Sequence, residues 1–169
     1  MRKIVTTVIA LALGPTIAMA DTAADCNQSD NLDLSIKACT ELIEKYKLDK
    51  TNLAGAYFNR GNAYSDKKDY PAAIANYGKA LELQPNNAGI YYNRGRAYRL
   101  NGQPDLAVAS YNKAIELDPK DANALSNRGH AYRDLGNNEK AIADFRAALA
   151  INPTHDRALA HLKELGVAP

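Results

Sequence analysis

The chain has 169 residues, the size of one ordinary domain or of a short array of repeats. Its hydrophobic residues include 30 Ala and 32 that are Leu, Ile or Val. Seven of these 32 aliphatic residues precede residue 20. Only two valines follow that point, so a substantial β-sheet is excluded. Charged residues make up 24% and are mixed in sign, which excludes a disordered chain, and the formal net charge is +2.

Residues 1–20 have the three parts of a secretory signal peptide. Arg2 and Lys3 precede an apolar run at residues 4–13, and Ala18-Met19-Ala20 provides an A-x-A cleavage site. The run is shorter than the about 20 residues that span a bilayer, and an uncleaved anchor is the alternative interpretation. We therefore expect cleavage after Ala20 and a periplasmic or secreted protein without membrane insertion.

Cys26 and Cys39 are the only cysteines of the chain. In an oxidising compartment each is the only possible partner of the other, so export predicts a disulfide between them. On the chain-entropy model it is worth about 3 kcal/mol. It would hold residues 25–32 against the following helix, expected at residues 33–46. Two free buried thiols are the alternative, and no C-x-x-C motif supports a redox-active pair.

The body of the chain is a repeat with a period of 34 residues. Asn-Arg-Gly recurs at 59–61, 93–95 and 127–129, and ten of the 34 positions are identical in all three units. Each unit predicts two helices, because Tyr57, Gly61 and Tyr64 share one helical face and Ala73, Tyr77 and Ala80 share another. In the first unit, Pro71 in the first turn of the second helix and Pro85 after its end mark the bounds of that helix.

The repeats divide the chain into segments. Residues 21–53 are expected to form a degenerate N-terminal half-repeat with the disulfide. Residues 54–87, 88–121 and 122–155 form the three units. Residues 156–169 contain Leu159, Leu162 and Leu165 and predict a capping helix with a short tail, because terminal repeats need a polar outer face.

These residues resemble the tetratricopeptide repeat (TPR) family. The family pattern is present as Tyr57, Gly61, Tyr64, Ala73, Tyr77 and Pro85, as Tyr91, Gly95, Tyr98, Ala107, Tyr111 and Pro119, and as Leu125, Gly129, Tyr132, Ala141, Phe145 and Pro153. The resemblance implies an all-α fold, a right-handed superhelical solenoid of antiparallel helix pairs with a C-terminal capping helix. The Cys pair and the segment after it are similar to small exported TPR proteins of Gram-negative bacteria.

One departure from the family pattern recurs in every unit. Arg60, Arg94 and Arg128 replace the aliphatic residue before the Gly. We interpret these arginines as ion-paired struts between helices.

Catalysis is not predicted. The chain has no glycine-rich phosphate loop, no G-x-S-x-G motif and no metal-ligand spacing. Carboxylates such as Asp66 and Asp69 are interpreted as helix-end residues. The sequence therefore predicts no enzyme, no cofactor and no metal.

The resemblance implies that the face of each first helix beside its core stripe lines a concave groove for a peptide. The expected groove residues are Phe58, Asn62 and Ser65, Tyr92, Arg96 and Arg99, and Ser126, His130 and Arg133, with Asn59, Asn93 and Asn127 beside them. The three arginines and the histidine favour an extended peptide with carboxylates, and Phe58 and Tyr92 would hold apolar side chains. Each residue alone also fits a solvated helix face, and the asparagines also fit a role as braces between repeats.

Some family members grip a C-terminal carboxylate with Lys, Asn and Arg. Asn62 and Asn93 fit that set, but Phe58 and Asn127 stand where cations are expected, so this activity is not carried over.

Two functions follow from this pattern. The first is an exported protein–protein interaction module, an adaptor or scaffold of the cell envelope that binds a peptide or protein with acidic groups. The alternative is a structural subunit that forms a homo-oligomer through its terminal helices. Removal of Arg2 and Lys3 with the signal peptide leaves 19 basic and 19 acidic residues, so bulk attraction to nucleic acid or membrane is not predicted.

Overall fold

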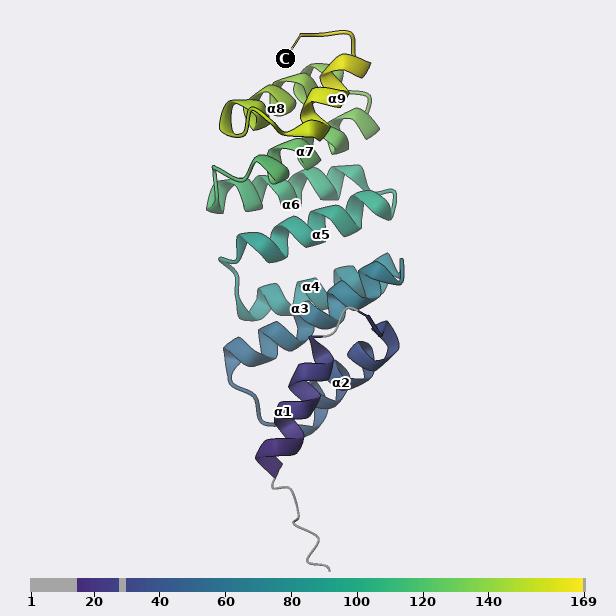
Figure 1. The fold of residues 1–169 in the computed structure, drawn as a ribbon, viewed down its shortest axis with the longest axis vertical. Coiled ribbons are helices and arrows are strands. Elements are labelled where there is room, and N and C mark those ends of the chain that lie inside the picture. The colour runs from purple at the N-terminus through teal and green to yellow at the C-terminus, as the bar shows by residue number, and fades with distance from the viewer. Residues whose placement is uncertain (1–14, 28–29, 169) are drawn as a thin grey trace, which may run out of the picture.

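The computed structural model describes residues 15–27 and 30–168, which contain nine α-helices and no strands. The helices are α1 (Pro15–Cys26), α2 (Leu32–Lys45), α3 (Lys50–Asp66), α4 (Tyr70–Leu83), α5 (Ala88–Leu100), α6 (Pro104–Leu117), α7 (Ala122–Asp134), α8 (Asn138–Ile151) and α9 (Asp156–Glu164). They stack in chain order along the long axis of the molecule (Figure 1). The predicted all-α solenoid of helix pairs is confirmed.

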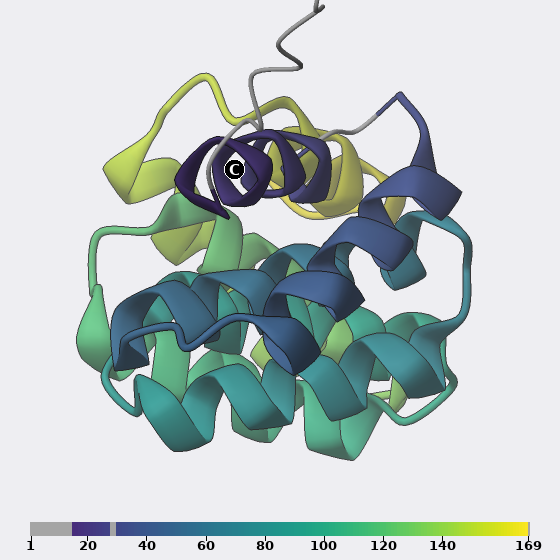
Figure 2. The same cartoon turned by 90° about the horizontal axis from the view of Figure 1, so that it is seen from below.

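The two helices of each unit have different neighbours. Helix α3 packs mainly on α4, α5 on α6 and α7 on α8, and each pair then packs on the next. Helix α3 also contacts α5, and α5 contacts α7, so the first helices form a continuous inner layer. An end view shows that α1 and α9 lie on the same side of the stack (Figure 2).

The sequence fixes the helix ends through short polar side chains and glycines. Side chains that accept a hydrogen bond from the first turn of a helix are those of Asn31, Asp49, Asp69, Asn87, Asp121, Asn137 and His155. Gly102 and Gly136 follow α5 and α7 with φ of 72° and 75°, as expected for helix-ending glycines. Lys68 takes the equivalent position after α3 with φ of 63°.

The core of each unit depends on a glycine in the first helix that faces an aromatic ring of the second. Gly61 faces Tyr77, Gly95 faces Tyr111 and Gly129 faces Phe145, and all three rings are buried. A Cβ added at Gly129 would lie 2.8 Å from Phe145 Cε1 and 3.2 Å from the carbonyl oxygen of Ala141. The glycine therefore sets how closely the two helices approach.

We expect Gly129→Ala to lower the free energy of unfolding by about 1–3 kcal/mol, because the new methyl group overpacks a site where backbone also lies close. The matched control is Gly78→Ala on α4, where an added Cβ meets nothing within 4 Å. Alanine should stabilise that helix by about 0.5–1 kcal/mol. Urea unfolding of both variants measures these changes. Equal changes in the free energy of unfolding, in the same direction, would contradict the role of Gly129 in setting the helix approach.

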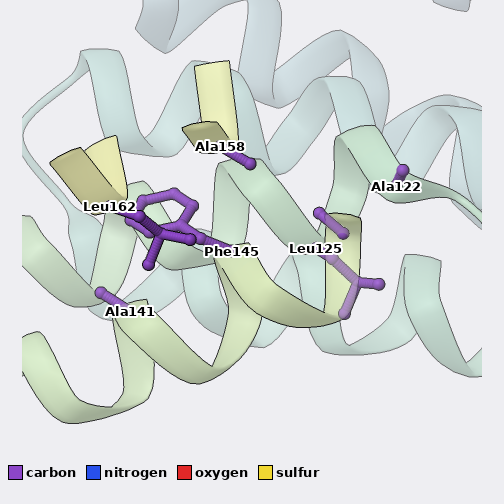
Figure 3. Close-up of a cluster of buried hydrophobic side chains, with 7 residues drawn as sticks. Ala122, Leu125, Ala141, Phe145, Ala158 and Leu162 are labelled. Carbon is purple, nitrogen blue, oxygen red and sulfur yellow. The ribbon is translucent and has the colours of Figure 1, made fainter. Parts of the chain in front are cut away.

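The largest buried cluster closes the C-terminal end of the solenoid. Phe145 of α8 and Leu162 of α9 point toward one another, and both are fully buried (Figure 3). Leu125 of α7 and Ala158 of α9 belong to the same cluster. Helix α9 therefore covers the apolar end of the third unit, as a capping helix must.

The N-terminal part extends beyond the expected elements. Residues 15–26 form one helix that crosses the predicted cleavage site after Ala20, and the alanines of this segment favour helix. The predicted signal peptide also includes residues 1–14, which lie outside the described residues. Helix α3 begins at Lys50, ahead of the unit boundary expected at residue 54, because the Asp49 side chain caps it by accepting from Asn52 N at 2.8 Å.

The arginines before the repeat glycines act as polar struts, but the interpretation as ion pairs is wrong for two of the three. Arg60 donates from Nε to Asn76 Oδ1 at 2.8 Å and from Nη1 to Thr40 Oγ1 at 2.9 Å. Arg94 donates from Nε to Ser110 Oγ at 3.3 Å. Within residues 15–27 and 30–168 the hydrogen-bond partners of these two arginines are neutral, so hydrogen bonding rather than ion pairing connects the helices there.

The third strut is an ion pair. Arg128 of α7 donates two hydrogen bonds to Asp144 of α8, at 2.8 and 2.6 Å, and a third to Asn112 of α6 at 2.8 Å. The hydrogen bond to Asp144 raises the pKa of Arg128. The side chain of Asp144 is only 8% exposed, so this pair joins three helices in a largely desolvated setting.

Candidate functional site

The first helices carry the predicted groove residues, and some of those on α3 and α5, among them Ser65, line a small polar cavity. This cavity has a volume of about 260 Å³. Its polar lining includes Asn59 and Asn62 of α3 and Asn93 and Arg96 of α5. Asp66 and the ring of Tyr77 complete that side, and the end of α1 closes the other. We call this space the polar cavity.

The asparagine side chains around the polar cavity differ in the hydrogen bonds that they form within the protein. Asn62 Oδ1 accepts a hydrogen bond from the Tyr77 hydroxyl at 2.8 Å, which fixes its orientation. Asn93 donates to the backbone oxygen of Gly89 at 2.9 Å, and Asn59 donates to Asn27 Oδ1 at 3.4 Å. Each of these three side chains keeps hydrogen-bonding capacity toward the cavity.

Arg96 is the cation of this cavity. It is exposed, and no ion pair to it is formed within residues 15–27 and 30–168. Its guanidinium carries five donors and a permanent charge, which suits it to bind a carboxylate. Asp66 also lines the cavity, so the lining includes an acidic residue beside the cation.

The other two arginines of the predicted groove hold structural ion pairs. Arg99 donates from Nε to Asp134 Oδ2 at 2.7 Å, which ties α5 to the end of α7. Arg133 pairs with Glu164 of α9 at 3.0 Å and contacts His161 Nδ1. The structure therefore separates Arg96 from the other two cations that the sequence grouped with it.

His130 lies beneath the capping helix and carries no charge at neutral pH. Its ring packs edge-on against Phe145 and His161, with centroids 5.3 and 4.2 Å apart. Burial is the main cause that lowers the pKa of His130 to about 3, and the nearby His161 and arginines lower it further. It therefore adds no positive charge to the groove.

The aromatic and asparagine positions serve different purposes in successive units. Tyr92 packs against Tyr111 with ring centroids 6.0 Å apart, and its hydroxyl accepts a hydrogen bond from Asn127 at 3.0 Å. Asn127 is buried and also donates to the oxygen of Asn123, so it braces the second and third units. Phe58 packs against Tyr77 at 5.9 Å but has no hydroxyl to offer Asn93. The predicted role as a brace between repeats is thus present at Asn127, and a ligand contact by Asn93 stays a prediction.

Two buried hydroxyls within the described part of the chain have no hydrogen-bond partner, those of Tyr111 and Ser126. The equivalent Tyr77 donates to Asn62, fifteen residues before it, but fifteen residues before Tyr111 stands Arg96, which accepts no hydrogen bond. Ser126 belongs to the predicted groove, but only 1% of it is exposed, so it has no access to a ligand in this conformation.

A larger cavity adjoins the polar one and was not foreseen from the sequence. It has a volume of about 470 Å³, and Cys26 and Asn59 line both spaces. Phe58 contributes its ring, and Met19 and Ala23 of α1 form one wall. We call it the apolar cavity. The Cys pair was the only sequence signal for it, because that pair brings the end of α1 to α2.

The disulfide between Cys26 and Cys39 is present, with Cα atoms 4.7 Å apart. Both residues are buried in a cluster with Ala38, Leu42 and Ala56. The Ser35 hydroxyl donates to the backbone oxygen of Cys26 at 3.0 Å, which adds a second tie between α1 and α2. The disulfide therefore fixes the helix that borders both cavities.

Two further structural findings concern the residues described. None of their helices combines the length and apolar character needed to cross a membrane. Within the same ranges, no three His, Cys, Asp or Glu side chains lie close enough together to hold a metal ion.

Comparison with protein families identifies the repeat. A model of the TPR repeat matches residues 61–102 and 95–133, and a tetratricopeptide repeat model matches residues 122–155. The chain belongs to the tetratricopeptide repeat family. A comparison with curated proteins finds no match.

Solved structures with the same fold cover most of the chain. The TPR domain of Arabidopsis OM64 is 30% identical with a TM-score of 0.68, and the match covers 70% of this chain and 98% of that one. The second TPR domain of human RPAP3, in complex with the HSP70 peptide SGPTIEEVD, is 27% identical with a TM-score of 0.67, covering 71% and 100%. A double mutant of MamA RS-1 has a TM-score of 0.80 at 22% identity, covering 92% and 85%, and shows the fold alone.

Proposed function

We propose that this protein is an interaction module that binds an extended acidic peptide segment of a partner protein in its inner groove. Binding centres on the polar cavity between α3 and α5. We further propose that the protein is exported and acts as an adaptor or scaffold in the cell envelope.

The observation that carries the peptide proposal is the grouping of Arg96 with Asn59, Asn62 and Asn93 around one cavity. Carboxamides bind the N–H and C=O groups of an extended backbone, and a guanidinium binds a carboxylate through paired hydrogen bonds. Arg96 is the groove arginine that is not engaged by Asp134 or Glu164. A peptide carboxylate would give it the ion-pair partner that no described residue provides.

The relatives support the same class of ligand. The human RPAP3 domain binds a peptide whose sequence contains two Glu and one Asp near its C-terminus. Another solved TPR domain, the first of Spaghetti (RPAP3), is 28% identical over 92% of its length and is bound to the HSP90 peptide SRMEEVD. The inner groove of this chain offers a cation and several amides to a ligand of that chemistry.

Two features support export. The sequence of residues 1–20 has a basic start, an apolar run and an A-x-A site. The disulfide between Cys26 and Cys39 requires an oxidising compartment to persist. Cell fractionation followed by N-terminal sequencing tests both parts, with Asp21 as the expected first residue of the mature protein.

Arg96→Glu should weaken binding of an acidic partner peptide by about 10- to 100-fold, because a hydrogen bond to a charged group is replaced by repulsion. The test is affinity capture from envelope extract, with each captured segment then titrated as a synthetic peptide. Arg96 alone is changed, because Arg99→Glu would also place two carboxylates together at Asp134.

The matched control is Arg146→Glu on α8, an exposed arginine that donates a hydrogen bond to the backbone oxygen of Ala168. It changes the net charge by the same amount without touching either cavity. Equal affinities of the Arg96→Glu and Arg146→Glu proteins for the captured peptide would contradict binding in the groove.

A further inference from the structure

The apolar cavity has features of a binding pocket in its own right. Its aliphatic and aromatic lining comes from several helices and includes Ala23, Leu42, Leu48, Phe58 and Ile90. Its volume of about 470 Å³ lies within the range of ligand pockets, which are mostly apolar with a few polar groups at the edge. The polar side chains at this edge are Thr51, Asn52, Asn59, Gln84 and Asn87.

The two cavities form one continuous surface. Cys26 and Asn59 line both of them, and successive groove residues lead from one to the other, with Phe58 in the apolar cavity and Asn62 in the polar one. An extended peptide advances about 3.3 Å per residue, so neighbouring side chains of one peptide can enter both spaces. The geometry therefore couples an apolar position of the ligand to its acidic position.

We propose that the apolar cavity binds one large aliphatic side chain, such as Leu, of the same peptide whose carboxylate binds Arg96. The inference rests on the proposed function and adds a second requirement to the ligand, an apolar residue within a few positions of the acidic one. The proposed cleavage after Ala20 removes Met19 from the α1 wall but keeps Ala23 and the disulfide-bonded Cys26. This wall lies outside the three repeats, so the requirement is set by the part of α1 that the disulfide holds against α2.

Gly55 of α3 provides a direct way to close the cavity. It lines the apolar cavity, and a Cβ added to it meets no atom within 4 Å. Gly55→Leu therefore adds its Cβ without a clash, and we expect the rest of the side chain to take up space in the apolar cavity. Gly78→Leu is the matched control, because Gly78 on α4 has equally open surroundings and lines neither cavity.

The probes are synthetic octapeptides with one Glu in an Ala and Ser background and one Leu placed one to four residues to either side of it. Two reference sets carry Ala in place of Leu or Gln in place of Glu. At the preferred spacing, Leu should tighten binding by about 10- to 100-fold over Ala, the gain expected for full burial of such a side chain. Gly55→Leu should remove that gain and leave the preference for Glu over Gln, whereas Gly78→Leu should retain both.

The outcomes separate this inference from the proposed function. If Glu peptides bind better than Gln peptides but Leu gives no gain at any spacing, the inference is wrong and the peptide function stands. A Leu gain that survives Gly55→Leu would also overturn it. If no peptide binds, or Glu gives no advantage, both are wrong. Self-association of the free protein that Gly55→Leu abolishes in light scattering would assign the cavity to a second copy of the chain instead.

Discussion

Asp144→Ala should lower the free energy of unfolding by about 3 kcal/mol. The change leaves Arg128, whose side chain is only 21% exposed, without its ionic partner, and removing one partner of a buried pair typically costs about 3–5 kcal/mol. We expect the lower end of that range because part of Arg128 stays in contact with water and its bond to Asn112 remains. Urea unfolding monitored by circular dichroism measures the effect.

The repeat itself supplies the control for this change. Asn76 and Ser110 occupy the positions equivalent to Asp144 in the first two units and pair with their arginines as neutral acceptors. Asp144→Asn should therefore cost about 1 kcal/mol, since a hydrogen-bond acceptor remains. If Asp144→Ala costs no more than Asp144→Asn, the ion pair does not contribute to stability beyond a neutral bond.

Removal of the disulfide by the double change Cys26→Ser and Cys39→Ser should cost about 3 kcal/mol. The bond closes a loop between residues 13 apart in sequence and restricts the unfolded chain, and both sulfurs are buried in the N-terminal cluster. The expected result is a lower urea midpoint for the variant than for the oxidised protein.

Reduction of the native protein with a dithiol provides an independent comparison. The reduced protein and the double Ser variant should have the same urea midpoint, and reduction should leave the variant unchanged. Because α1 depends on this bond for its position, both forms should also lose the preference for a Leu-containing peptide. An unchanged midpoint after complete reduction would show that the N-terminal packing holds α1 without the bond.

The sequence predicted the repeat fold because its signals are local and recur. Gly61, Gly95 and Gly129 stand at one spacing and each faces an aromatic ring, and the helix-ending glycines have the positive φ expected of them. The capping helix could also be foreseen from the leucines after residue 156. Such features depend on helical periodicity and on contacts inside one unit, which a single sequence displays directly.

The groove was less predictable, because its residues are distinguished by contacts between units. The sequence places Arg96, Arg99 and Arg133 on equivalent faces, but only the three-dimensional arrangement assigns Asp134 to Arg99 and Glu164 to Arg133. The charge of His130 is likewise set by burial under α9, which periodicity does not report. The apolar cavity depends on α1, a helix outside the repeat pattern.

The presence or absence of one hydroxyl group changes the surroundings of equivalent asparagines in this array. The hydroxyl of Tyr92 engages Asn127, whereas Phe58 has none and leaves the carboxamide of Asn93 at the edge of a cavity. The repeat places an asparagine at this position in all three units. The side chain opposite it in the preceding unit decides whether the asparagine connects two units, as Asn127 does, or stays at the edge of a cavity, as Asn93 does. A new specificity in such a repeat can therefore arise when a partner is lost, with no change to the residue that then meets the ligand.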